Sequence, residues 1–216
     1  MAGYNEVKAD VKAVGMHFSF QLLILREQGD AEGPAAVQEN GVRVAALTRK
    51  GVTMRLFIAI PLSDEMKSAV TGTMHEMKKA GVKGSYVPTR NLHLTLAFIG
   101  EMKEAASVSE ALQNVSFKPF RLSFSELGSF GDLLYVGLKG NQGLSGAVKN
   151  VREALDAAGI AYDRKKFVPH VTIIRNAAGN FKSVKAPSGE MTVKGFSLMK
   201  SELKDGKRIY TEIRGF

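Results

Sequence analysis

The amino-acid sequence predicts a domain of mixed strands and helices, built from two similar halves that face a shared cleft. Two observations carry this prediction. A histidine and a threonine stand two residues apart in two separate apolar segments, and the elements around them recur at a nearly constant spacing. A third observation limits the chemistry: the chain has no cysteine, which excludes disulfides, thiolate metal sites and thiol nucleophiles.

The first of these motifs lies in the apolar run of residues 91–100. Side chains alternate between the two faces of a β-strand, so His93 and Thr95 project from one face and Leu92, Leu94 and Leu96 from the other. The same arrangement recurs near residue 170, where His170 and Thr172 share a face and apolar residues pack behind them. Each motif therefore places an imidazole and a hydroxyl side by side.

An internal repeat connects the two motifs. Residues 56–60 match residues 134–138 at an offset of 78, and His93 matches His170 at an offset of 77. Each half is thus expected to contain a strand, a helix and a second strand that carries His-x-Thr. Two such halves related by an approximate two-fold axis would bring the histidine strands together. A solenoid, in contrast, would need three or more units.

The remaining elements follow from hydrophobic periodicity and from turn residues. A buried strand begins at Met54, and Ser63 is expected to cap a helix that ends at Gly81. The other expected elements are helices at 104–112 and 144–158, strands at 120–126, 133–138, 168–175, 193–203 and 208–213, a turn at 128–131 and a hairpin turn at Asp205-Gly206.

Residues 1–53 differ in character from the rest of the chain. They lack a sustained hydrophobic period and hold six basic and six acidic residues, so the whole net charge of +9 belongs to residues 54–216. We expect residues 1–53 to form a poorly ordered extension that is not native, with Met54 as the natural start and a small added hairpin as the alternative. The apolar run at 18–25 is too short to span a bilayer and lacks the basic lead-in of a signal peptide.

The residues alone leave three interpretations of the paired histidines open. They could be structural, or they could hold a metal, although neither motif supplies a third histidine or a carboxylate. They could instead act as general acid and general base on a phosphate, with the threonine hydroxyls on its non-bridging oxygens. Duplication at matching positions favours a functional role, and the basic surplus favours an anionic partner such as nucleic acid or a phosphorylated ligand.

The doubled motif resembles the H-x-T/S-x signature of the two-histidine (2H) phosphoesterases. The match is closer to the RNA 2′,3′-cyclic phosphodiesterases, also called 2′-5′ RNA ligases. The resemblance covers residues 54 to about 214. It rests on His93-Leu94-Thr95-Leu96, His170-Val171-Thr172-Ile173, Val87-Pro88, Leu127-Gly128-Ser129-Phe130 and Phe167-Val168-Pro169.

The resemblance implies a bilobal α+β fold with two antiparallel sheets lining a central cleft and helices outside. It also implies that His93 is the general acid, that His170 is the general base, and that Thr95 and Thr172 bind phosphate. Arg175, at the end of the second motif, is a further candidate phosphate ligand. The implied reaction is hydrolysis of an RNA 2′,3′-cyclic phosphate end to a 2′-phosphate without metal or cofactor, with weak reversible 2′-5′ ligation. Because the two halves are alike, the sequence does not reveal which histidine is the acid.

Four further residues are candidate contacts to a base or to the RNA backbone: Tyr86, Phe130, Phe167 and Arg164. Tyr86 stands where the family often has tryptophan. The expected partner is RNA with a 2′,3′-cyclic phosphate end, tRNA fragments among them, bound by a cytoplasmic monomer without membrane association. One alternative is a non-catalytic RNA-end or nucleotide-binding module of the same fold, and another is an enzyme for a small cyclic phosphate.

Overall fold

A computed structural model of the protein describes residues 6–13, 16–23, 38–39, 42–43 and 53–216. The chain divides into two compact units, Met1–Gly51 and Val52–Phe216. In the first unit, β1 (Glu6–Ala13) pairs antiparallel with β2 (Met16–Leu23), and β3 (Gln38–Glu39) pairs antiparallel with β4 (Val42–Arg43). Much of residues 1–53 lies outside the described residues, so the expectation of a poorly ordered, non-native extension stays a prediction.

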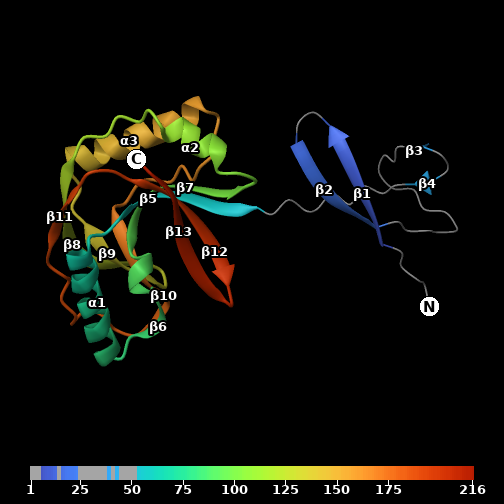
Figure 1. Cartoon of the computed structure of the whole chain (residues 1–216). Helices are drawn as coiled ribbons and strands as arrows, with labels where there is room; N and C mark the ends of the chain where they lie inside the picture. The colour runs from blue at the N-terminus through green and yellow to red at the C-terminus, as the bar shows by residue number, and fades with distance from the viewer. Residues whose placement is uncertain (1–5, 14–15, 24–37, 40–41, 44–52) are drawn as a thin grey trace, which may run out of the picture. The chain divides into compact units, whose positions relative to one another are not determined.

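The second unit is built on two antiparallel sheets (Figure 1). One sheet has the strand order β13-β12-β5-β7, and the other has the order β11-β8-β9-β10-β6. The strands are β5 (Met54–Pro61), β6 (Lys83–Tyr86), β7 (His93–Met102), β8 (Phe120–Phe130), β9 (Leu133–Leu138), β10 (His170–Ala178), β11 (Glu190–Val193), β12 (Ser197–Lys204) and β13 (Lys207–Gly215). The helices are α1 (Asp64–Lys79), α2 (Ala106–Leu112), α3 (Gln142–Ala157) and the short 3₁₀ helix η1 (Thr89–Asn91). This arrangement confirms the predicted bilobal α+β fold.

The two sheets exchange elements between the halves of the sequence. Strand β6 precedes β7 in the chain, yet it pairs with β10 of the second half. Strands β12 and β13 come last, yet β12 pairs with β5 of the first half. The lobes are therefore interlocked, and β7 and β10 pack against each other. As the repeat predicted, the two histidine strands meet.

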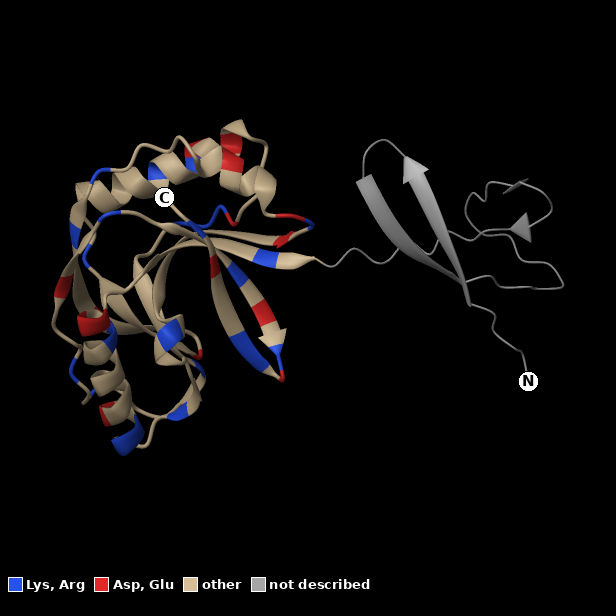
Figure 2. Ribbon diagram, viewed as in Figure 1, with Lys and Arg blue, Asp and Glu red and all other residues tan. Residues whose placement is uncertain are grey.

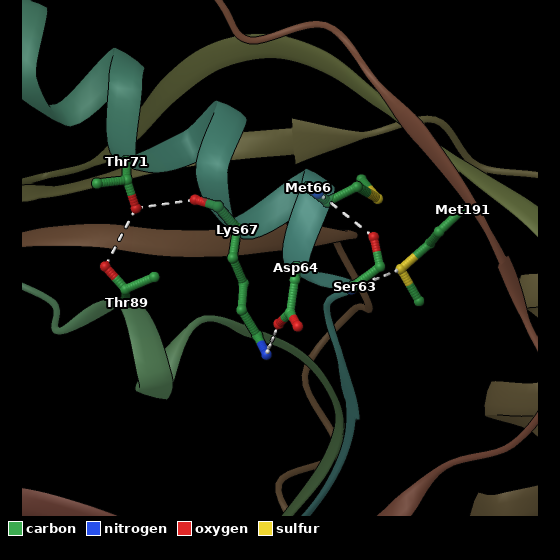
Figure 3. Close-up of polar contacts among 7 residues, drawn as sticks. All are labelled: Ser63, Asp64, Met66, Lys67, Thr71, Thr89 and Met191. Atoms are coloured by element: carbon green, nitrogen blue, oxygen red, sulfur yellow. Dashed lines mark hydrogen bonds and ion pairs between the residues drawn. The ribbon is translucent and has the colours of Figure 1, made fainter.

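Helix α1 begins where the sequence predicts. The hydroxyl of Ser63 accepts a hydrogen bond of 3.3 Å from the backbone N–H of Met66 (Figure 3). One face of the helix is buried in the core, with Met66 and Val70 at 1% exposure or less. The side chains of Thr71 and Thr89 meet at 3.1 Å, which joins the solvent side of α1 to η1 just ahead of the first histidine strand (Figure 3).

Helix α3 repeats the design of α1 in the second half. The side-chain oxygen of Asn141 accepts a hydrogen bond of 2.9 Å from the N–H of Leu144, and the chain leaves the helix through Gly159 at φ 66°. Gly81 follows α1 with φ 81°. A side chain with a Cβ is strained in this left-handed conformation, so glycine favours both helix ends.

Two predicted elements differ from the structure, and one strand of the structure was not predicted. Strand β8 continues to Phe130 through most of the expected turn at 128–131, and the chain turns at residues 131–132. Gly128 leaves room for the ring of Tyr135, which a Cβ would approach to 2.5 Å. The single strand expected at 193–203 is two strands, β11 and β12. They are separated where Phe196 exchanges backbone hydrogen bonds with Phe216. Strand β6 was not predicted, since its sequence, Lys-Gly-Ser-Tyr, has no apolar pattern.

Among the described residues, no helix is long and apolar enough to cross a membrane.

Candidate active site

A cavity of about 290 Å³ opens beside the first histidine strand. It is lined by residues of β5, β7, β12 and β13 together with one residue of β10: Arg55, Phe57, His93, Thr95, Phe98, Arg175, Ser201, Arg208 and Tyr210. Both sheets therefore contribute to the cavity, and it collects three of the predicted site residues.

The backbone and Thr95 fix the orientation of the His93 ring. Its Nδ1 lies 2.6 Å from the carbonyl oxygen of Asn91, and its Nε2 lies 3.1 Å from the hydroxyl oxygen of Thr95. A carbonyl oxygen only accepts, so Nδ1 carries the hydrogen and donates it. In the neutral ring, Nε2 then presents a lone pair, and this is the nitrogen available for proton transfer.

Two aromatic rings enclose the His93 imidazole. The ring centroids of Phe57 and Tyr210 lie 5.0 and 5.2 Å from that of His93. This burial lowers the pKa of His93 below its ordinary value of 6.5, against the opposing effect of the hydrogen bond to Asn91. The positive charges of Arg175 and of protonated His170 lower the pKa further. With no anion beside it, His93 is therefore mainly neutral at pH 7.

The second histidine repeats this arrangement on β10. The Nδ1 of His170 lies 2.7 Å from the carbonyl oxygen of Val168 and donates to it, which leaves Nε2 for chemistry. The rings of Phe130 and Tyr135 lie 5.2 and 5.3 Å from the His170 ring and stack on each other. Tyr135 matches Phe57 at the repeat offset of 78, so the duplication includes the aromatic partners of the histidines.

The two histidines are close enough to interact electrostatically. The charge of His170 acts on the pKa of His93, and their strands pack against each other. Neither His170 nor Thr172 lines the cavity itself. They lie on the neighbouring strand β10, where Thr172 is paired with Tyr135 in the register of β9 and β10. The predicted pair of His-x-Thr motifs is thus brought together, with the cavity on the side of His93.

Arg175 reaches the cavity from the second sheet. It is exposed, it stands where the β6–β10 register shifts, and the next residue, Asn176, has φ 50°. Within residues 53–216, no carboxylate oxygen lies within 4 Å of the guanidinium of Arg175 or Arg208, whereas Arg55 forms a 3.0 Å ion pair with Glu101. Arg175 and Arg208 are therefore cations at the cavity without an acidic partner in this part of the chain.

The four candidate RNA contacts lie in different surroundings. Phe130 is 44% exposed beside His170, which keeps one ring face available. Tyr86 donates its hydroxyl hydrogen to the carbonyl of Val82 at 2.7 Å, and Phe167 packs against the core. Arg164 pairs with a carboxylate of α3. None of the four lines the cavity, and their contact with RNA stays a prediction.

Sequence reasoning missed six of the nine residues that line the cavity, Arg55 and Phe98 among them, and it missed the role of Asn91. Phe57 had a signal, since it matches Tyr135 in the repeat. The sequence shows Asn91 only as the first residue of an apolar run. Ser201, Arg208 and Tyr210 had no local signal, because they reach His93 only when the last two strands join the sheet of the first half. Across the part of the chain that the structure describes, no three His, Cys, Asp or Glu side chains gather as metal ligands.

The two imidazoles lie on strands β7 and β10, which pack against each other, and each has a threonine two residues on, as in the signature of the two-histidine phosphoesterases. The chain belongs to the 2′-5′ RNA ligase superfamily, whose family model matches residues 66–205. The family predicted from the doubled motif is thereby confirmed.

Individual relatives agree with this assignment. The RNA 2′,3′-cyclic phosphodiesterase of Archaeoglobus fulgidus is 33% identical over 178 residues, which cover 76% of this chain and 99% of the relative. The protein of that name from Methanocaldococcus jannaschii is 29% identical and covers 74% and 99%. The crystal structure of E. coli LigT in apo form superposes with a TM-score of 0.66 at 26% identity and covers 76% and 96%, and its complex with 3′-AMP superposes with a TM-score of 0.63.

Proposed function

We propose that this protein is an RNA 2′,3′-cyclic phosphodiesterase that opens the cyclic phosphate at an RNA end to a 2′-phosphate. The observation that carries the proposal is the doubled imidazole. On both β7 and β10 a backbone carbonyl accepts the Nδ1 hydrogen, so that each histidine has its Nε2 available for proton transfer. The relatives with this name support the same substrate class.

Proton transfer at the two Nε2 atoms accounts for the reaction. His170 removes a proton from water as the water oxygen attacks phosphorus, the bond from phosphorus to O3′ breaks, and His93 gives its proton to O3′. General acid and general base catalysis contribute about 10²- to 10⁴-fold each. The products are a 2′-phosphate and a 3′-hydroxyl.

The surrounding side chains support these roles. His93 must be protonated before it can act as the acid, and a phosphate anion beside it favours the imidazolium, which opposes the effect of burial. Thr95, Thr172 and the guanidinium of Arg175 are suited to hold the non-bridging oxygens, where negative charge develops in the transition state. In this proposal substrate binding itself prepares the acid.

The proposal is tested with an oligonucleotide that ends in a 2′,3′-cyclic phosphate. His93→Ala and His170→Ala should each lower kcat by about 10²-fold or more, and wild-type activity should persist in EDTA. Full activity of either variant would remove that histidine from the mechanism. Complete loss of activity on chelation would contradict catalysis by two imidazoles alone.

A bridging sulfur in place of O3′ distinguishes the acid from the base. A thiolate leaves without needing a proton, so His93→Ala should recover much of its lost rate on this substrate, whereas His170→Ala should not. Recovery in the opposite variant would reverse the assignment of the two histidines.

The proposal extends to the cellular location, the oligomeric state and the natural substrate of the protein. We expect a cytoplasmic monomer that acts on RNA fragments, tRNA fragments among them. Light scattering at working concentration checks the monomer, since a stable dimer would double the mass.

A further inference from the structure

One face of the β12–β13 hairpin lines the cavity beside His93 and extends beyond it along the two strands. The register pairs Ser201 with Tyr210 and Leu203 with Arg208, and residues two apart on one strand share a face. Ser201, Tyr210 and Arg208 line the cavity together with His93. Strand β12 pairs with β5 only as far as Ser201, so the hairpin extends past the edge of β5. This face therefore runs from the histidine to the exposed end of the hairpin.

Arg208 is the cation on this face. Its closest polar side-chain contact is Nη1 to the hydroxyl oxygen of Ser201, at 3.4 Å. Other basic residues lie along the hairpin (Figure 2), but Lys200 forms a 3.0 Å ion pair with Glu202. Arg208 has no such partner within residues 53–216, so its charge is available to an anion in the cavity.

The position of Arg208 is tied to that of His93 by one buried residue. Asn91, only 3% exposed, donates from its side-chain amide to the carbonyl oxygen of Arg208 at 3.0 Å. The backbone carbonyl of Asn91 accepts the Nδ1 hydrogen of His93. The same residue thus holds both the imidazole and the backbone that carries the guanidinium.

The spacing along β13 suits a second phosphate. The Tyr210 ring lies 5.2 Å from the His93 ring, and Arg208 stands two residues further along the strand, or about 7 Å. Arg208 thus lies farther along the strand from the ring that packs on His93, on the same face of the sheet. A guanidinium can bind a phosphate through two parallel hydrogen bonds, which also fixes its orientation.

We propose that Arg208 binds the phosphodiester that joins the terminal nucleotide to the one before it, while the cyclic phosphate lies at the two histidines. This inference rests on the proposed phosphodiesterase activity. It makes Arg208 a specificity determinant, so that the enzyme favours an oligonucleotide end over a mononucleotide 2′,3′-cyclic phosphate.

Three substrates test the inference: a mononucleotide 2′,3′-cyclic phosphate, a dinucleotide with the same cyclic end and a 2′-deoxy first sugar, and that dinucleotide with a neutral methylphosphonate linkage. Arg208 can form a charge-assisted hydrogen bond with the charged linkage but not with the neutral one. The kcat/KM of the wild type should therefore be about tenfold higher on the charged linkage. Arg208→Gln should bring this ratio close to one.

Lys207→Gln is the matched control. It removes the same charge from the neighbouring position, whose side chain points to the opposite face of the strand, and it should keep the wild-type ratio. An unchanged ratio in Arg208→Gln, or an equal fall in Lys207→Gln, would overturn the inference. If the wild type hydrolyses none of the three substrates, the proposed activity itself is wrong and the inference falls with it. Hydrolysis without discrimination by linkage overturns the inference alone.

Discussion

At the scale of single residues, the site depends on how each histidine is held. The Nδ1 hydrogen of each ring is donated to a backbone carbonyl two residues earlier in the chain, which selects one tautomer and aims Nε2 outward. This geometry is local, and it follows from the strand that carries the motif. It explains why His-x-Thr is informative from sequence alone.

The pKa of His93 gives a prediction at this scale. Because burial lowers it, the His93 ring should titrate below 6.5 in an NMR pH titration, and added inorganic phosphate should raise the midpoint. His93→Gln identifies the resonance. A midpoint at or above 6.5 without phosphate would contradict the enclosed, neutral imidazole.

The same shift affects stability in a defined direction. A histidine whose pKa is lowered by folding takes up a proton more readily in the unfolded chain, so protonation favours unfolding. Its stabilising contribution is present above pH 6.5 and is lost as the pH falls below that value. The urea midpoint of the wild type should therefore fall more than that of His93→Gln between pH 7.5 and pH 5.

At the scale of elements, the aromatic pairs connect strand packing to catalysis. Tyr135 on β9 contacts the His170 ring, and it fits only because Gly128 on β8 has no side chain. In the other sheet, the ring of Phe57 on β5 contacts the ring of His93. The strands beside β7 and β10 thus position the imidazoles from the side, and the match of Phe57 to Tyr135 in the repeat is the one sign of this in the sequence.

Gly128→Ala tests that connection. The added Cβ would lie 2.5 Å from the Tyr135 ring, so the ring must move. Overpacking of this kind costs about 1–3 kcal/mol, and we expect a lower urea midpoint together with a lower kcat. Gly140→Ala is the control, since a Cβ there meets nothing within 4 Å. A lower midpoint with unchanged kcat would show that Tyr135 does not position His170.

At the scale of the whole molecule, the interlocked sheets explain what the sequence could and could not predict. The His-x-Thr motifs, the repeat and the Ser63 cap of α1 can be seen in the sequence itself, and the structure contains all of them. The hairpin that brings Arg208 and Tyr210 to His93 pairs with β5 from the far end of the chain. Such pairing has no local signature, and neither does the transfer of β6 to the second sheet.

The interlocked unit also predicts which part of the chain is needed for function. Every residue that lines the cavity lies between Arg55 and Tyr210, inside the unit Val52–Phe216. A protein that starts at Met54 keeps all of β5, so it should retain kcat/KM within about twofold and an unchanged urea midpoint for this unit.

The control starts at Ile58. It removes Arg55 and Phe57 along with the first half of a strand that pairs on both sides with β7 and β12. The truncation leaves strand edges unpaired and removes the fully buried core residue Leu56. We therefore expect this shorter protein to be unfolded, as measured by circular dichroism. A large loss of activity in the Met54 protein, with its fold intact, would show that residues 1–53 take part in the reaction and are not a dispensable extension.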